Sequence, residues 1–550
     1  MSNILINNYL RFVILAGRRL ASTENNVDIG GRMKMLNDNK QHRKVLELFD
    51  AFNEKNIDKC SNWIIIQALK ACTQICDVQY GLKIHNLISS RLKHDPYVLP
   101  SLIHLYMQCS DVNRAESLFN TSTKKTLPIY GAMMKGYIKN NLANKAANLF
   151  KDIQNPDLIS IILLFNACAQ LRTHEALNLV KIVSSKVPQG FHSNPYVLTS
   201  LIDAFMKCGD IKSAQSVFHA STQKALSMYG AMMKGYLVNN MPNKAITLFK
   251  EIHDPDKVIV TLFFNACAQL GTDKELDLIK IVSSNISKSF HSSPYVVTSL
   301  IDAFMKCGDM KNAQAVFQAS TKKTLSMYAA MMAGFNKNEL AEKAVDIFNG
   351  IHHDEFYRKN DTKNEFNLLS KMKNDCADGN IIIYLCMIKA LAKIGMLETA
   401  KSFVQRIPSF FLVDRRIQNA LIDMWGKVDS VDEAKRIFRI MSQPDHIGYT
   451  AMINSYGLNG MGVEAVEFYR QMPKELIHES TYVCVLNACS HSGLVAEARL
   501  IFNNIQTKTE IIYTTMIDCL SRAVAFDEAR ELMEKFERDH PPSVVMHSQY

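Results

Sequence analysis

Residues Pro195 to Phe218 read PYVLTSLIDAFMKCGDIKSAQSVF. A closely similar stretch, PYVLPSLIHLYMQCSDVNRAESLF, occupies residues 96–119, and PYVVTSLIDAFMKCGDMKNAQAVF occupies residues 294–317. Each copy begins 99 residues after the previous one, and each 99-residue block divides into units of 31, 31 and 37 residues. Self-similarity at a fixed period is the mark of a repeat protein.

The central copy has the spacing of two short helices. Its apolar residues recur on one helical face, at Leu201, Ile202, Phe205 and Met206 and then at Ala214, Val217 and Phe218. Gly209 suits a left-handed helix end, and Asp210 suits the N-cap of the next helix. A single hairpin cannot bury its apolar face, but stacked hairpins can, so the pattern predicts a solenoid.

At this point the chain resembles a known family. LIDAFMKCGDIKSAQSVF, YGAMMKGY and LFFNACAQLG are similar to pentatricopeptide repeats, and the alternation of unit lengths resembles the mixed-length subclass. The rival tetratricopeptide repeat has a W-x2-L-G-x2-Y motif that this chain lacks. The resemblance runs from about Asn62 to the C-terminus. It implies an all-α solenoid, a right-handed superhelix of about 28 helices.

The units are expected to start near these residues: Asn62, Pro96, Leu127, Leu158, Pro195, Leu226, Lys257, Pro294, Leu325, Ile381, Arg415, His446, Glu479 and Glu510. They form two predicted arrays, over residues 62–351 and 381–543. Residues 352–380, which are highly charged, are interpreted as an insertion or a degenerate repeat. Residues 544–550 are interpreted as a truncated tail that lacks the deaminase domain carried by some members of the family.

The N-terminus has the composition of a targeting segment. Residues 1–25 are predicted to be a mitochondrial transit peptide because Met1 to Thr23 has no acidic residue and contains Arg11, Arg18 and Arg19. The alternative is a disordered tail. Residues 26–61 are predicted to be a polar linker, over Asn26 to Lys40, followed by a capping helix that begins near His42.

Composition and the absence of catalytic motifs limit the possible functions. The 550 residues carry a net charge of +10, a mild basic excess compatible with a polyanionic partner. The thirteen cysteines include no C-x-x-C pair, which fits a reducing compartment and small core residues. Phosphate-loop, zinc-protease and serine-hydrolase motifs are absent. We therefore expect no enzyme activity, no cofactor, no metal and no membrane span.

The resemblance also implies which residues read RNA. In the family, the fifth residue of each first helix and the last residue of each unit form a pair that contacts one base. Asn419 with Asp445 corresponds to uracil, and the other polar fifth residues are Thr199, Thr261, Thr298, Thr450 and Thr514. Eight fifth positions are apolar or too small to read a base: Ile66, Pro100, Gly131, Ile162, Gly230, Ala329, Leu385 and Val483. Asn419 and Asp445 could also be two ordinary surface residues.

A row of basic residues is independent of that code. The thirteenth residue of seven units is basic: Lys139, Lys207, Lys306, Lys337, Lys393, Lys427 and Arg522. Stacked helices would align these charges along a phosphate backbone. Lysine is also common near helix C-termini because its charge interacts favourably with the helix dipole. The row can therefore be interpreted either as a phosphate-binding surface or as a set of helix-stabilising residues.

The function expected from these features is binding of single-stranded RNA in mitochondria. The protein would be a monomeric specificity or stabilising factor in RNA processing, editing or translation, with a processing or deaminase enzyme acting in trans. The alternative is a scaffold that holds a peptide on the same surface.

Overall fold

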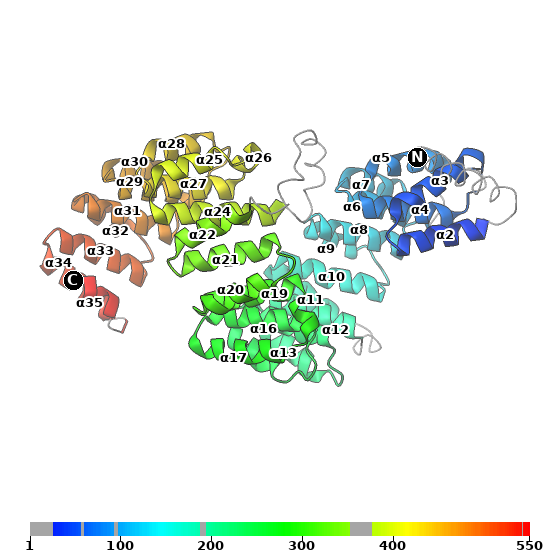
Figure 1. Cartoon of the computed structure of the whole chain (residues 1–550), viewed down its shortest axis with the longest axis horizontal. Coiled ribbons are helices and arrows are strands. Elements are labelled where there is room, and N and C mark those ends of the chain that lie inside the picture. The colour runs from blue at the N-terminus through cyan, green and yellow to red at the C-terminus, as the bar shows by residue number, and fades with distance from the viewer. Residues whose placement is uncertain are drawn as a thin grey trace. The chain divides into compact units, whose positions relative to one another are not determined.

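The computed structural model describes residues 26–56, 60–92, 97–186, 194–351, 377–538, 540–541 and 543–549. Over these residues it has 33 α-helices, one short 3-10 turn and no strand (Figure 1). The predicted all-α class is therefore confirmed. The hand of the superhelix stays a prediction.

Twenty-eight of the helices form consecutive pairs. The pairs are α4 (Asn62–Ile75) and α5 (Val78–Leu92), α6 (Val98–Gln108) and α7 (Val112–Thr121), α8 (Leu127–Lys139) and α9 (Ala143–Phe150), α10 (Leu158–Leu171) and α11 (His174–Lys186), α12 (Pro195–Lys207) and α13 (Ile211–Ala220), α14 (Leu226–Val238) and α15 (Pro242–Phe249), α16 (Lys257–Leu270) and α17 (Asp273–Asn285), α19 (Pro294–Lys306) and α20 (Met310–Ala319), α21 (Leu325–Lys337) and α22 (Ala341–Ile351), α24 (Ala377–Ile394) and α25 (Leu397–Val404), α27 (Arg415–Lys427) and α28 (Val431–Ile440), α29 (His446–Leu458) and α30 (Gly462–Gln471), α31 (Glu479–His491) and α32 (Val495–Asn504), and α33 (Glu510–Arg522) and α34 (Phe526–Glu537). All but two first helices begin at the predicted start; α6 begins at Val98 and α24 at Ala377.

The chain divides into two compact units, up to Phe263 and from Phe264 onward. Within the first unit each first helix packs on the next, from α4 through α6, α8, α10 and α12 to α14. Within the second unit the same contact runs from α19 through α21, α24, α27, α29 and α31 to α33. Second helices pack beside them, as α13 does against both α12 and α14. Each unit is therefore a layer of first helices backed by a layer of second helices.

The turn inside each pair follows the predicted chemistry. Gly209 has φ +83°, and Asp210 accepts a hydrogen bond from the backbone N–H of Ser213 at 3.1 Å. Leu201, Ile202, Phe205, Met206, Ala214 and Phe218 are buried as expected, whereas Val217 is only half-buried. The local signals of the sequence therefore place the helix ends correctly here.

Glycine allows successive first helices to approach closely. A Cβ built on Gly235 of α14 would lie 2.3 Å from Cγ of Met206 on α12. The same relation recurs one 99-residue block away in each direction, between Gly136 and Met107 and between Gly334 and Met305. An asparagine side chain then ties each of these helices to its neighbour. Asn239 donates to the carbonyl oxygen of Met206 at 2.8 Å, which sets the relative position of α14 and α12.

The interpretation of Asn26 to Lys40 as a linker is wrong. Helix α2 (Asn26–Asp38) precedes α3 (His42–Asn56) and packs on both α3 and α4. Met33 is fully buried, and the amide of Asn37 donates to the backbone oxygen of Gln67 at 3.0 Å. The polar composition of this segment suggested a linker. The Trp63 ring, however, occupies the space that a Cβ at Gly30 would need.

Smaller helices complete the structure: α18 (Lys288–His291), α26 (Ser409–Leu412), the 3-10 turn η3 (Lys474–Leu476) and α35 (Val544–Gln549). The predicted tail at residues 544–550 is thus helical as far as Gln549. Its Met546 is fully buried, and α35 packs on α33. The predicted transit peptide and most of the predicted charged insertion lie outside the described residues.

Candidate nucleic-acid interface

The predicted threonine readers lie in the first turns of their helices and bond to their own backbone. The hydroxyls of Thr199, Thr261, Thr298 and Thr514 donate to the carbonyl oxygen four residues earlier at 2.6, 2.7, 2.7 and 2.8 Å. Thr450 instead pairs with the hydroxyl of Thr481 at 3.1 Å. A hydroxyl has one donor and two acceptor positions, so a threonine whose proton is already used is left as an acceptor.

Asn419 and Asp445 are directly bonded to each other. Nδ2 of Asn419, on α27, donates to Oδ1 of Asp445 at 3.0 Å. The same carboxylate oxygen caps α29 by accepting from the N–H of Gly448 at 3.0 Å. Nε of Arg415 lies 3.3 Å from Oδ2 of Asp445. The last residue of the unit thus organises its fifth residue, its first residue and the start of the next unit.

This network stabilises the charged form of Asp445. Partial burial alone would raise the pKa of this carboxyl group, but the hydrogen bonds from Gly448 and Asn419 and the charges of Arg415 and His446 outweigh it. The pKa of Asp445 therefore lies below its usual value. With its oxygens engaged by three partners, Asp445 acts as a positioning residue for Asn419.

Asn419 has one N–H left for a ligand. An amide nitrogen carries two donors, and only one of them is bonded to Asp445. The amide oxygen Oδ1 is buried and has no hydrogen-bond partner among the described residues. It faces Gly448, where a Cβ would lie 2.9 Å away. Asn419 is 6% exposed, and the second N–H of its amide is the only donor of this side chain that is not already used.

The basic row is largely neutralised by acidic neighbours. The ninth residue of four of these helices is an aspartate that pairs with the thirteenth. Lys207 lies 2.7 Å from Asp203, Lys306 2.8 Å from Asp302, Lys427 2.7 Å from Asp423, and Arg522 2.9 Å from Asp518. Each pair lies on one face of its own helix, at the i, i+4 spacing.

The other three members of the row reach back to the preceding first helix. Lys139 donates to the carbonyl oxygen of Gln108 at 2.8 Å, and Lys337 to that of Lys306 at 3.0 Å. Lys393 donates to the carbonyl oxygen of Asn336 and to Glu339, both at 2.7 Å. Cations placed at helix C-termini interact favourably with the free carbonyl groups there. In this structure the basic residues of the row therefore form ion pairs and hydrogen bonds near the C-terminal ends of first helices. Phosphate binding by the row stays a prediction.

Three exposed lysines were missed by the prediction. Lys135, Lys234 and Lys389 occupy the ninth position of their units, where other units have the pairing aspartate. None of them has a hydrogen bond or ion pair to the described residues. A comparison of the ninth residues of all units would have found these lysines, because no acidic residue one turn away in the same helix offsets their charge.

A second missed feature is the exposed apolar residue that follows the first residue of many first helices. Tyr196 is 72% exposed and Tyr295 is 81% exposed, although the two residues that follow each tyrosine are buried. Aliphatic side chains occupy the same position in other units: Ile159, Val258, Ile382, Ile447 and Ile511 are all exposed. The exposed aromatic rings of Tyr196 and Tyr295, in units whose fifth residues are Thr199 and Thr298, suit the stacking of bases. The sequence signal was an apolar residue at the second position of the unit, directly before the third and fourth positions, which face the core.

Eight of the twelve cysteines in the described residues are buried. Cys168 and Cys267 are fully buried, and burial raises the pKa of each thiol to about 12, which keeps the thiols protonated. The described residues contain no group of three or more His, Cys, Asp or Glu side chains placed to hold a metal ion. None of the helices in the described part of the chain has the length and hydropathy needed to cross a membrane.

Paired helices stacked in two layers define a helical repeat protein of the α-solenoid class. The model of the PPR repeat matches ten segments: residues 128–155, 196–221, 227–254, 295–323, 326–356, 382–410, 419–443, 447–475, 480–508 and 511–540. The chain belongs to this family of pentatricopeptide repeat proteins.

Similar proteins come from Arabidopsis thaliana. The mitochondrial pentatricopeptide repeat-containing protein At2g03380 is 26% identical over 90% of this chain and 71% of its own length. The chloroplastic protein At1g11290 is 27% identical over 84% of this chain, which spans only 56% of that relative. Among solved structures, PPR10 in complex with an 18-nt psaJ RNA element is 15% identical with a TM-score of 0.39, over 98% of this chain and 90% of that one.

Proposed function

We propose that this protein binds single-stranded organellar RNA along its first helices and acts as a specificity or stabilising factor in RNA processing, editing or translation. Repeats of this family read one base per repeat through two or three side chains. The observation that carries the proposal is the Asn419–Asp445 pair, whose members are hydrogen-bonded at the junction of two successive first helices. Its remaining amide N–H can donate to a uracil carbonyl oxygen.

The division of labour follows from the chemistry of each position. Lys135, Lys234 and Lys389, whose charges are not neutralised, supply the first phosphate contacts, and the thirteenth-residue cations add contacts where RNA displaces their aspartates. Tyr196 and Tyr295 provide faces on which bases stack. The threonines at the fifth position accept hydrogen bonds from base N–H groups. Units with an apolar fifth residue contribute affinity without discrimination.

Several finer features belong to the same proposal. The 99-residue block of 31, 31 and 37 residues supports assignment to the mixed-length subclass. We propose a monomer that recruits a processing or deaminase enzyme in trans, with repeat arrays over residues 62–351 and 381–543. A transit peptide over residues 1–25 would direct the protein to mitochondria. Fusion of this segment to a fluorescent reporter tests the last point, and a diffuse cytosolic signal would reject it.

The RNA proposal is tested by crosslinking the protein in cells, sequencing the bound RNA and measuring affinity for the recovered sites. Changing Asn419 to Thr should move the preference at one nucleotide from uracil towards a purine. The discrimination lost should be on the order of 1–3 kcal/mol. Absence of any binding to single-stranded RNA at low salt would favour the alternative, a scaffold whose apolar fifth positions contact a peptide.

A further inference from the structure

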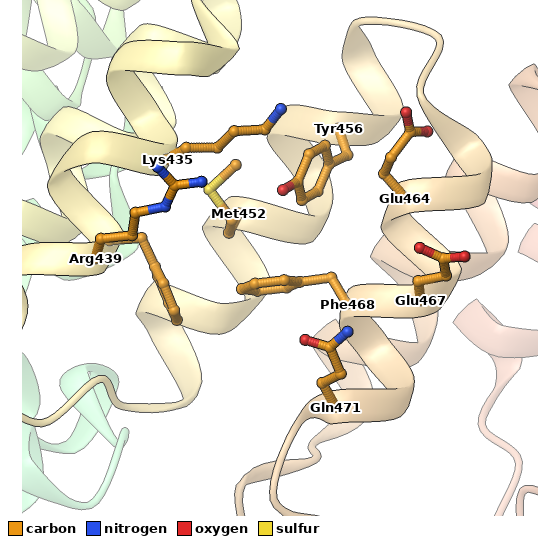
Figure 2. A pocket seen from close by; sticks show the side chains of 9 residues that line it. Lys435, Arg439, Met452, Tyr456, Glu464, Glu467, Phe468 and Gln471 are labelled. Atoms are coloured by element: carbon orange, nitrogen blue, oxygen red, sulfur yellow. The ribbon is translucent and has the colours of Figure 1, made fainter.

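A hollow opens between the second helices α28 and α30, over the middle of α29. Its volume is about 270 Å³, and its floor is formed by Phe438, Met452, Tyr456 and Phe468. Figure 2 shows Lys435 and Arg439 on one side and Glu464 and Glu467 on the other. All of these residues come from the second helices or, for Met452 and Tyr456, from α29, and none of them is a fifth residue of its unit.

An ion pair closes the corresponding gap at two other places in the chain. The fifth residue of a second helix faces the third residue of the next second helix across it. In α7 and α9 these are Glu116 and Lys145, which form an ion pair at 2.7 Å that Tyr137 joins by donating to Glu116 at 2.9 Å. In α32 and α34 they are Arg499 and Glu528, which are paired at 2.6 Å. An ion pair across this gap therefore occurs at two places in the array, between α7 and α9 and between α32 and α34.

Between α28 and α30 the same two positions carry Lys435 and Glu464, and no ion pair joins them. Nζ of Lys435 instead lies 5.3 Å from the centre of the Tyr456 ring and 3.7 Å from Asp432 on its own helix. Within the described part of the chain, Arg439, Glu464 and Glu467 have neither an ion pair nor a hydrogen-bonded side-chain partner. The hollow thus combines opposite charges of suitable sign with an aromatic floor, yet it stays open.

The chemistry of the walls selects the kind of side chain that fits. Glu464 and Glu467 lie three residues apart on one face of α30, so both carboxylates can reach one cation. Phe438 and Phe468 pack edge to face at 5.0 Å on the floor. A guanidinium group is planar, stacks on aromatic rings and donates to two carboxylates at once, and its apolar stem suits such a floor. Arg439 on the opposite wall can pair with a carboxylate that follows in the same peptide.

We propose that this hollow is a docking site for an arginine side chain in a peptide segment of a partner protein, with an acidic residue one or two positions away. The two unpaired glutamates favour this occupant over a nucleic acid, because a phosphate placed beside them would be repelled. The proposal goes beyond RNA binding and does not depend on it, because the lining residues differ from those assigned to bases and phosphates.

The test uses a fluorescein-labelled pentapeptide of glycines with one arginine and one glutamate, two residues apart. Fluorescence anisotropy with the full chain should show saturable binding. Replacement of the arginine by citrulline, a neutral isostere, should weaken binding at least tenfold. The variant Glu464→Gln/Glu467→Gln should weaken binding of the arginine peptide to a similar extent. Its circular dichroism spectrum should match that of the wild type, since both side chains are exposed.

Matched controls come from the closed gap. Glu116→Gln removes a carboxylate at the corresponding place between α7 and α9 and should leave peptide binding unchanged. The proposal is overturned if the arginine and citrulline peptides bind equally, or if no binding occurs at millimolar protein. It is also overturned if Glu116→Gln weakens binding as much as the double change. Displacement of the peptide by single-stranded RNA would contradict it too, because the site would then belong to the RNA surface.

Discussion

Asp445, the last residue of its unit, makes three separate contacts that organise the surrounding helices. It caps α29, holds the amide of Asn419 and pairs with Arg415. The sequence alone suggested that Asn419 and Asp445 act together, through the family resemblance. It did not indicate that Asp445 uses both carboxylate oxygens inside the protein, which makes Asn419 the member of the pair that is left to meet a base.

The stabilisation by Asp445 should depend on pH. Its pKa is lower in the folded protein than in the unfolded chain, so its contribution is present above the unfolded value near 4 and is lost as the pH falls through the folded value. Asp445→Asn should reduce the free energy of unfolding by about 1 kcal/mol at pH 6, because charge-assisted hydrogen bonds are lost. Urea unfolding of wild type and variant at pH 6 and pH 3 measures this.

Comparison of the two proteins at each pH removes the effect of other acidic caps, such as Asp210 and Asp309, whose pKa values are also lowered. The difference in stability should shrink at pH 3. An equal difference at both values of pH would show that the charge of Asp445 does not contribute.

Two lysines on neighbouring first helices separate the interpretations of the basic row. Lys234 has no acidic partner, whereas Lys207 is paired with Asp203. Lys234→Ala should flatten the log–log salt dependence of RNA binding by roughly 0.7, the value for one phosphate contact of a single strand. Lys207→Ala should flatten it less, because Asp203 already offsets its charge. The measurement is RNA affinity of both variants at several salt concentrations between low and moderate salt. Equal slopes for the two variants would indicate that the thirteenth-residue cations are the main phosphate contacts.

At the scale of the helices, close approach between first helices depends on one glycine per contact. Gly235 and Gly230 lie on the same helix, α14, but only Gly235 faces a neighbour closely. A Cβ on Gly230 would meet nothing nearer than Cδ1 of Ile259 at 3.7 Å. The two positions therefore form a matched pair in which helix propensity is equal and packing differs.

Gly235→Ala should destabilise the protein by about 1–3 kcal/mol, the usual cost of overpacking a close contact. Gly230→Ala should be neutral or stabilising by up to about 1 kcal/mol, because alanine is the better helix former. Thermal unfolding followed by circular dichroism measures both. Equal effects would mean that Met206 moves aside at no cost and that the glycine is dispensable.

At the scale of the whole molecule, contacts join mainly neighbouring repeats, so damage should stay local. Gly235→Ala should raise amide hydrogen exchange in α12 to α15 and leave α27 to α34 unchanged. Hydrogen-exchange mass spectrometry of wild type and variant gives the comparison. Faster exchange throughout both compact units would indicate that the array unfolds as one cooperative body.

The sequence by itself determined the class of the fold and the rhythm of the repeats. The apolar spacing, the capping aspartates and the glycine turns are local signals. Such signals predict where helices such as α12 and α13 begin and end. The same signals failed for α2, since a helix of polar composition is stabilised there by Trp63 and Gln67, which follow much later in the chain.

Only the tertiary structure decided which charges are available to a partner. The sequence shows Lys393 as a lysine near a helix end, but its Nζ lies 2.7 Å from a carboxylate oxygen of Glu339, which is 54 residues away in the chain. Lys435 and Glu464 carry opposite charges at positions that form an ion pair between α7 and α9, but the side chain of Lys435 lies over Tyr456 and a hollow remains. Secondary structure follows from neighbours along the chain. The availability of a charge depends on distances of a few ångströms between side chains, which only the folded structure sets.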